Sequence, residues 1–231
     1  MNAIPKLFVA VDKSNTKEAK ELIQKLTPKS CGIKVGKELF TACGPKIIDW
    51  IQSKGFEVFL DLKYHDIPNT VEKACSVASE MGVSVLNVHA LGGKEMMLSA
   101  REGIDKSKNR PCLIAVTLLT STNKKTLESI GFYAPIDNII LNLATSAKEA
   151  KLDGIVCSAE DISKIKASLP ESFLYVTPGI RFSNSLNDDQ KRIVSPSEAI
   201  NMGSNILVIG RPITQAKDPE GVLNQIINEI T

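Results

Sequence analysis

Short apolar runs alternate with amphipathic segments along almost the whole chain of 231 residues. The apolar runs are rich in Val, Ile and Leu, which is typical of β-strands. They predict eight strands, over residues 7–12, 32–36, 58–63, 84–90, 111–117, 154–159, 174–180 and 206–211.

The segments between these runs repeat their apolar residues with the period of a helix. They predict helices over residues 16–26, 46–54, 71–81, 93–102, 136–150, 159–167, 197–202 and 219–230. Eight strands that alternate with helices favour right-handed βαβ units that close into a parallel barrel. We therefore expect an α/β fold, a single-domain (β/α)8 TIM barrel over residues 1–231. A doubly wound open sheet stays possible, because strand counting does not exclude it.

Polar and aliphatic residues alternate within the first five predicted strands, and successive strand residues point to opposite faces. One alternating set is polar, with Asp12, Lys34, Asp61, Lys63, Asn87, His89 and Thr117. The other set is aliphatic, with Val9, Val11, Ile33, Val35, Leu60, Leu62, Leu86, Val88, Ile114 and Val116. In a barrel, the aliphatic set would pack under the helices and the polar set would converge on the axis. The polar residues lie near the carboxyl ends of their strands, where barrels carry active sites.

The segment 59–70, which reads FLDLKYHDIPNT, concentrates charge at the end of a predicted strand. Asp61 and Lys63 are two residues apart and should share a face, about 6.6 Å apart along the strand. Burying a carboxylate and an ammonium group is costly unless they serve each other or a ligand. With Asp66 added, the segment predicts an electrostatic site. A structural ion pair at the barrel mouth is the alternative, and Asp66 could cap the next helix, although Asn69 or Thr70 is the favoured cap.

The overall charge is nearly balanced, which limits the classes of partner. The net charge is +2, with 43% hydrophobic residues, and neither value indicates a nucleic-acid or membrane partner. The five scattered cysteines and two histidines lack the spacing of a zinc site, so we expect reduced thiols and no metal. The first apolar run is too short for a signal sequence, and no run approaches the ~18 residues of a membrane span. These features indicate a cytoplasmic protein.

The run DLKYHDIPNT at 61–70 resembles the signature of the orotidine 5'-phosphate decarboxylase family, in its bacterial branch. Similar segments follow the family's order along essentially the whole chain: VAVD at 9–12, IKVG at 33–36, VTLLTS at 116–121, VTPGIR at 176–181, DQKR at 189–192 and IGRP at 209–212. The resemblance implies a lyase that converts orotidine 5'-phosphate to UMP and CO2, the last step of de novo pyrimidine biosynthesis. It also implies a nucleotide substrate, no metal or organic cofactor, and a homodimer.

The resemblance assigns a role to each matching residue. It implies a catalytic set of Lys63, Asp61, Asp66 and Lys34. Lys63 would stabilise the carbanion at C6 and protonate it, and Asp61 would face the substrate carboxylate, acting more by fixing Lys63 than by repulsion. The residues implied in substrate binding are Asp12 and Lys34 at the ribose, Asp61, Thr120 at the pyrimidine, Arg181, Gln190, Gly210 and Arg211 at the phosphate, and Asp66, Ile67 and Thr70 reaching into the partner's site.

The phosphate end is also predicted from the residues themselves. Gly179 and Gly210 lie at the carboxyl ends of the last two predicted strands, where backbone amides can approach an anion, and Arg181 and Arg211 add charge. Each motif alone is usually a plain turn. The polar segment 182–191 could be an ordinary surface loop, but because it follows Arg181 and carries Gln190 we predict a lid that orders on phosphate binding. His65 and His89 are interpreted as structural or supporting groups, and Trp50 as a core or subunit contact.

Two other functions stay open. A related barrel acting on sugar phosphates shares the Asp-x-Lys-x-x-Asp pattern but uses Mg²⁺ and an enediolate; the segments 117–121 and 65–70 favour the nucleotide enzyme. A nucleotide-phosphate sensor without catalysis is the other alternative, and an intact Lys63 with both carboxylates argues against it.

Overall fold

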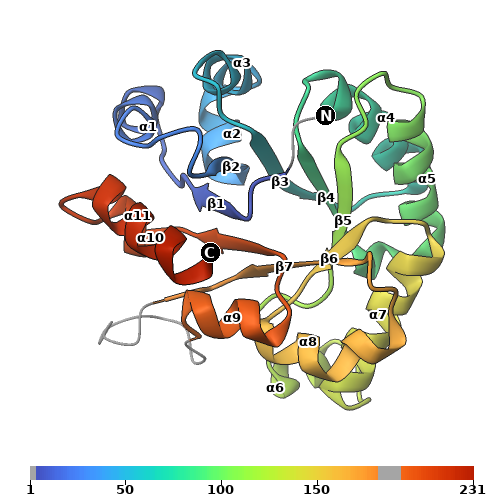
Figure 1. Ribbon diagram of the computed structural model, residues 1–231. Coiled ribbons are helices and arrows are strands. Elements are labelled where there is room, and N and C mark those ends of the chain that lie inside the picture. Colours follow the sequence, from blue (N-terminus) through green and yellow to red (C-terminus); the bar gives the residue numbers. More distant parts are fainter. Residues whose placement is uncertain (1–3, 182–193) are drawn as a thin grey trace.

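The computed structural model describes residues 4–181 and 194–231. Its eight strands are all parallel and pair in chain order, and β1 also pairs with β8, so the sheet closes into a barrel (Figure 1). The strands are β1 (Leu7–Ala10), β2 (Gly32–Gly36), β3 (Val58–Tyr64), β4 (Val85–His89), β5 (Cys112–Val116), β6 (Gly154–Val156), β7 (Leu174–Pro178) and β8 (Ile206–Ile209). This closure confirms the (β/α)8 barrel and excludes the open sheet.

The helices surround the barrel (Figure 1). They are α1 (Thr16–Ile23), α2 (Lys37–Cys43), α3 (Lys46–Ser53), α4 (Pro68–Glu80), α5 (Gly93–Asp105), α6 (Lys124–Ser129), α7 (Ile136–Glu149), α8 (Ala159–Ile165), α9 (Pro196–Met202), α10 (Arg211–Thr214) and α11 (Pro219–Ile230). Two short 3-10 turns, η1 (Ala90–Gly92) and η2 (Lys166–Ser168), complete the described elements.

Each of the eight predicted strands and eight predicted helices is confirmed, in the same order, although the ends differ and further helices are present. The short helices α2, α6 and α10 were not predicted, and Arg211 begins α10 instead of ending a strand. Helix α4 begins at Pro68, because a proline at the first helical position has its φ already set for a helix. The predicted caps Asn69 and Thr70 are therefore wrong, since both residues lie inside the helix.

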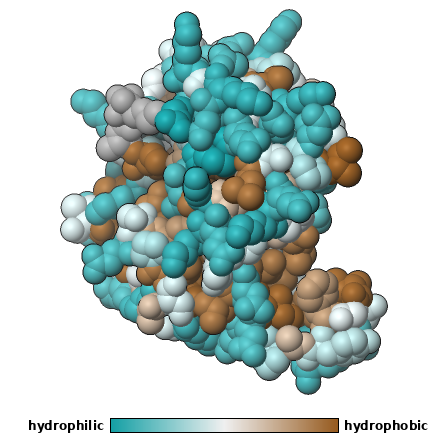
Figure 2. Space-filling view, turned by 90° about the vertical axis from the view of Figure 1, so that its right-hand side faces the viewer, coloured by the Kyte–Doolittle hydropathy of each residue, from teal (hydrophilic) through white to brown (hydrophobic). Residues whose placement is uncertain are grey.

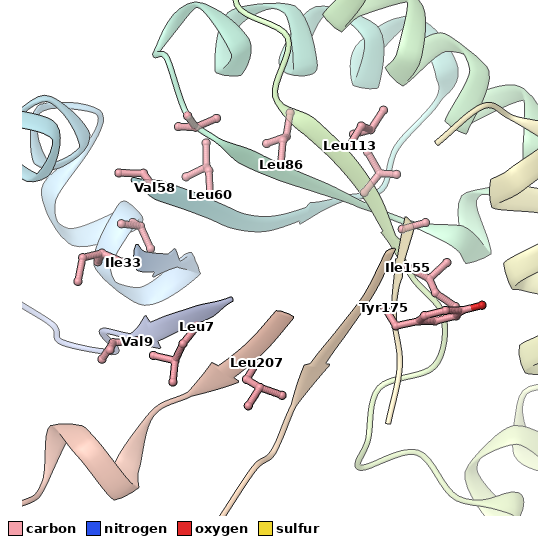
Figure 3. Packing of buried hydrophobic residues seen from close by; sticks show 14 of the residues in the cluster. Leu7, Val9, Ile33, Val58, Leu60, Leu86, Leu113, Ile155, Tyr175 and Leu207 are labelled. Carbon is pink, nitrogen blue, oxygen red and sulfur yellow. The ribbon is translucent and has the colours of Figure 1, made fainter. Parts of the chain in front are cut away.

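Two layers of apolar side chains hold the barrel together. The larger layer lies between the strands and the helices and includes Val9, Ile33, Leu60 and Leu207, which point outward from their strands in Figure 3. The smaller layer fills the barrel interior and includes Phe8 and Phe59, whose rings meet edge to face. Burial of these large side chains stabilises the fold by about 1.5–3 kcal/mol each. For β1 to β4, the aliphatic set packs under the helices as predicted.

The predicted orientation of β5 is wrong. Ile114 packs in the barrel interior, whereas Leu113 and Ala115 join the layer under the helices. Thr117 belongs to the same alternating set as Leu113, and its hydroxyl donates to the carbonyl of Val156 on β6 at 2.9 Å. Because β5 is apolar at every position, alternation carried no information about which set faces inward.

The surface differs between regions of the molecule. Figure 2 shows the face of the molecule that lies on the right-hand side in Figure 1. Hydrophilic side chains dominate the upper part of this face, and hydrophobic ones gather toward its lower end. Exposed hydrophobic side chains Ile130, Phe132 and Tyr133 follow α6, which lies at the lower end of Figure 1. Among the described helices, none is long and apolar enough to span a membrane.

Candidate active site

A chain of alternating charges crosses the carboxyl ends of the first three strands. Lys34 Nζ on β2 lies 3.0 Å from Asp61 Oδ2 on β3. It also lies 3.7 Å from Oδ1 of Asp12, which follows the carboxyl end of β1. Lys63 Nζ on β3 lies 2.6 Å from Asp61 Oδ1. The prediction that these four residues converge is therefore confirmed, with Asp61 at the centre and a lysine on each of its oxygens.

The central carboxylate is charged despite its burial. Only 10% of the Asp61 side chain is exposed, and this burial opposes ionisation. The ammonium groups of Lys34 and Lys63, together with hydrogen bonds from Lys63 and Asn87, outweigh it and lower the pKa of Asp61 to about 2. The carboxylate therefore stays ionised throughout the neutral range and holds both cations in place.

Lys63 reaches Asp61 through a bulge in β3. Leu60 pairs with Leu86 and Tyr64 with Val88, so three residues of β3 lie opposite Asn87 alone on β4. Lys63 has a φ of 53°, in the left-handed region that costs a non-glycine residue about 1–3 kcal/mol. The prediction that Asp61 and Lys63 share a face of a regular strand is therefore wrong. The bulge turns the Lys63 side chain back onto Asp61.

Asn87 supports this bulge, a role that the sequence did not reveal. Its Oδ1 accepts from the backbone N–H of Lys63 at 2.8 Å, and its Nδ2 donates to Asp61 Oδ1 at 2.6 Å. The side chain thus takes the place of the strand pairing that the bulge interrupts. The polar alternation put Asn87 on the inward set, but its partners could be recognised only once the bulge was known.

Gly36 leaves space for the charged chain. A Cβ atom at this position would lie 3.1 Å from Lys34 Nζ and 3.3 Å from Asp12 Oδ1. Any side chain would therefore displace the lysine that joins Asp12 to Asp61. Gly36 matched the family segment 33–36, and the structure gives that match a steric reason.

The two histidines lie beside Lys63. Their rings stack with centroids 5.6 Å apart, and His89 Nδ1 accepts a long hydrogen bond of 3.4 Å from the Leu91 N–H. Burial, followed by the charges of His65, Lys63 and Lys37, lowers the pKa of His89 to about 4. A neutral imidazole at pH 7 fits the prediction that His89 is a supporting group.

The residues predicted to cross a dimer interface lie on the surface of the chain. Asp66, Ile67 and Thr70 are exposed, and 65% of Ile67 is accessible although it is apolar. Asp66 Oδ1 accepts from the N–H of Ile67, and the first turn of α4 has no side-chain cap. Asp66 is thus not the helix cap, and it is accessible for another partner.

The predicted phosphate residues follow two adjacent strands. Because β7 pairs with β8, Gly179 and Arg181 lie at the same end of the barrel as Gly210 and Arg211. Gly179 has a φ of 82°, which favours glycine, whereas Gly210 is the N-cap of α10. Arg181 is buried and donates to the carbonyl of Ile180, and Arg211 is exposed. Gln190 and the predicted lid 182–191 lie outside the described residues.

Thr120 lines a cavity of about 370 Å³ at the same end of the barrel. The cavity lies between the segment that follows β5, the start of α8 and the end of β7, and Gly179 also lines it. Thr120 and Gly179, assigned to the base and to the phosphate end, thus share one cavity. Its volume is in the usual range for small-molecule sites.

The carboxylate of Asp61 is arranged to bind the ammonium groups of lysine side chains. Asp61 Oδ1 already accepts from Lys63 and Asn87, and Oδ2 faces Lys34. Two ammonium groups against the same carboxylate would repel a divalent cation. In the described residues, no group of three or more His, Cys, Asp or Glu side chains has the arrangement of a metal site.

Known proteins resemble the chain over nearly its whole length. The model of the orotidine 5'-phosphate decarboxylase / HUMPS family matches residues 5–226. Two proteins named orotidine 5'-phosphate decarboxylase are similar to this chain. The protein from Saccharophagus degradans is 51% identical over 226 residues, which cover 98% of this chain and 95% of the relative. The protein from Legionella pneumophila (strain Corby) is 48% identical over 227 residues, which cover 98% of this chain and 99% of the relative. The crystal structure of the Lactobacillus acidophilus orotidine 5'-phosphate decarboxylase is 35% identical, with a TM-score of 0.88 over 99% of this chain and 100% of that one.

Proposed function

Because the chain belongs to the orotidine 5'-phosphate decarboxylase / HUMPS family, we propose that this carboxy-lyase converts orotidine 5'-phosphate to UMP and CO2 with Lys63 as the reacting cation. The observation that carries the proposal is the fixed ammonium group of Lys63, held 2.6 Å from a buried, ionised Asp61. Its reaction would belong to pyrimidine biosynthesis.

The chemistry requires a cation in a fixed place. Loss of CO2 from C6 leaves an electron pair in the plane of the ring, where no adjacent carbonyl can delocalise it. A preorganised ammonium group stabilises that charge as it develops and then donates a proton to C6, which gives UMP. Lysine suits this task because its ammonium is a compact donor, unlike the planar fork of arginine.

Asp61 would act mainly by holding Lys63. Its Oδ1 accepts from Lys63 and its Oδ2 faces Lys34, so much of its charge is already compensated within the chain. Repulsion between Asp61 and the substrate carboxylate would be weakened by the same two cations. The geometry therefore favours preorganisation of Lys63 over destabilisation of the bound substrate.

The remaining residues would bind the nucleotide. Asp12 and Lys34 would hold the ribose hydroxyls, Thr120 would contact the pyrimidine, and the phosphate would be held by Arg181, Gln190, Gly210 and Arg211. The exposed positions of Asp66, Ile67 and Thr70 on one surface support a homodimer of single-domain barrels in which these residues complete the partner's site.

The sugar-phosphate alternative would need carboxylate oxygens that can bind Mg²⁺. In this chain the oxygens of Asp61 are occupied by Lys63, Asn87 and Lys34, which favours the nucleotide reaction. The proteins at 48–51% identity also carry the decarboxylase name.

The test follows the absorbance of orotidine 5'-phosphate during incubation with the wild type, Lys63→Ala and Lys166→Ala. Wild type and Lys166→Ala, which removes an exposed lysine on η2, should consume the substrate at equal rates. Lys63→Ala should lose at least about 10⁴-fold in kcat, since one group supplies both charge stabilisation and the proton. Wild type without turnover, or Lys63→Ala with turnover near that of the wild type, would contradict the proposal. Activity that disappears with EDTA would favour the metal-dependent alternative.

A further inference from the structure

Asn87 joins the two groups on which the proposed reaction depends. Its amide oxygen accepts from the backbone N–H of Lys63, and its amide nitrogen donates to Asp61. None of its surface is exposed. A substrate in the barrel mouth would therefore not touch Asn87, which can act on the reaction only through its two partners.

We propose that Asn87 is a positioning residue for the decarboxylation, which clamps the left-handed backbone of Lys63 and the carboxylate of Asp61 in a single arrangement. This inference rests on the proposed function. The clamp is needed because the bulge removes the regular pairing of β3 at Lys63 itself. Without a local acceptor, the N–H of Lys63 would be buried without a partner or the bulge would rearrange.

The two hydrogen bonds explain why the residue is an asparagine. The Lys63 N–H requires an acceptor, whereas the ionised Asp61 requires a donor, and a primary amide carries both on one short side chain. An aliphatic residue would supply neither, and an ionised aspartate would supply only acceptors. The bond to Asp61 is charge-assisted, which makes it stronger than a neutral one.

The clamp lies among several groups that carry charge or can titrate. Asp61 and Lys63 belong to β3, Lys34 to β2, and His89 to β4 itself. The groups that extend this set are Asp12, which ion-pairs with Lys34, and His65, which stacks on His89.

The first test compares Asn87→Ala with the wild type in the orotidine 5'-phosphate assay. Loss of the clamp should lower kcat about 100-fold, the size of effect caused by a displacement of about 1 Å, while KM changes less than about threefold. A folded Asn87→Ala variant with kcat within threefold of the wild type would overturn the inference.

In the variant Asn87→Asp, kcat relative to the wild type should depend on pH, which a purely structural role of Asn87 would not cause. The introduced carboxyl lies against ionised Asp61, and repulsion raises its pKa. Once protonated, it can donate to Asp61 and still accept from the Lys63 N–H, which restores both bonds. The ratio of variant to wild-type kcat should therefore rise about tenfold from pH 8 to pH 5. A ratio independent of pH would contradict the proposal.

Asn205→Asp is the matched control. Asn205 also accepts from a backbone N–H, that of Tyr175 at 2.8 Å, but at the opposite end of the barrel. This variant should keep the wild-type kcat and pH profile.

Hydrogen exchange separates the two proposals. The Lys63 amide should exchange at least tenfold faster in Asn87→Ala than in the wild type, whether or not the protein decarboxylates the nucleotide. An inactive wild type would count against the proposed function. Unchanged exchange at Lys63 would overturn the clamp itself.

Discussion

The two ends of the barrel use the same kinds of residue for different purposes. At the carboxyl end, Asp61 is buried and joins two lysines and Asn87. At the amino end, Asp153 is half-exposed; its Oδ2 binds Arg101 Nη2 at 2.6 Å and accepts from the Leu113 N–H at 2.7 Å. Asp61 therefore gathers cations at one point, whereas Asp153 ties a helix to the start of a strand.

The two ends also differ in how their polar and charged groups are partnered and strained. The amino end has a cavity of about 960 Å³ whose lining includes two acidic residues, each partnered: Asp153 by Arg101, and Glu57 by a hydrogen bond from Ser84. The carboxyl end carries backbone strain at Lys63 and a neutral, half-buried His89. One end thus gives up stability for a preorganised charge, and the other uses its polar contacts to close the fold.

Lys63→Gly gives the largest expected effect. Glycine accepts the φ of 53° without strain, and the bond from residue 63 to Asn87 is retained because it involves the backbone. We expect kcat to fall at least about 10⁴-fold. The free energy of unfolding should stay level or rise by up to about 1 kcal/mol, because the released strain offsets the lost ion pair with Asp61, which Lys34 and Asn87 still compensate. Urea unfolding and the decarboxylation assay measure the two quantities.

Lys151→Gly is the control for the released strain. Lys151, just after α7, is the other non-glycine residue with positive φ among those described, at 60°. It lies away from the charged chain, so the variant should gain similar stability with unchanged kcat. A clear loss of stability in Lys63→Gly alone would mean that the lysine stabilises the fold, against the comparison.

Replacing one glycine at each end with alanine should destabilise the fold at the amino end but not at the carboxyl end. In Gly154→Ala, at the amino end of β6, the new Cβ would collide with the backbone carbonyl of Leu174, which cannot move without distorting the barrel. We expect a loss of about 2–4 kcal/mol in the free energy of unfolding, or failure to fold. In Gly36→Ala the new Cβ meets the flexible end of Lys34, so stability should hardly change and kcat/KM should fall about tenfold. Equal effects on stability would contradict this division.

Much of the fold was predictable because the barrel is built from local patterns. Apolar runs and helical periodicity located all eight strands, and the inward polar positions of β1 to β3 identified the charged chain. Where both alternating sets are apolar, as in β5, the pattern could not assign the faces. The bulge at Lys63 has no local signature, since it depends on β4, and the role of Asn87 follows only from that bulge.

His89→Gln gives the smallest effect, a change in how stability depends on pH. The pKa of His89 falls from 6.5 to about 4 in the folded protein, so between these values the unfolded chain binds a proton that the folded chain does not. The stability that the neutral imidazole contributes is complete above pH 6.5 and declines as the pH falls toward 4. Urea unfolding between pH 7.5 and 4.5 should show a smaller decline in His89→Gln than in the wild type. The control His65→Gln keeps the buried imidazole of His89 and should retain most of the wild-type dependence of stability on pH. An equal decline in wild type and His89→Gln would show that His89 titrates normally, and that its burial at the carboxyl end does not lower stability at acidic pH.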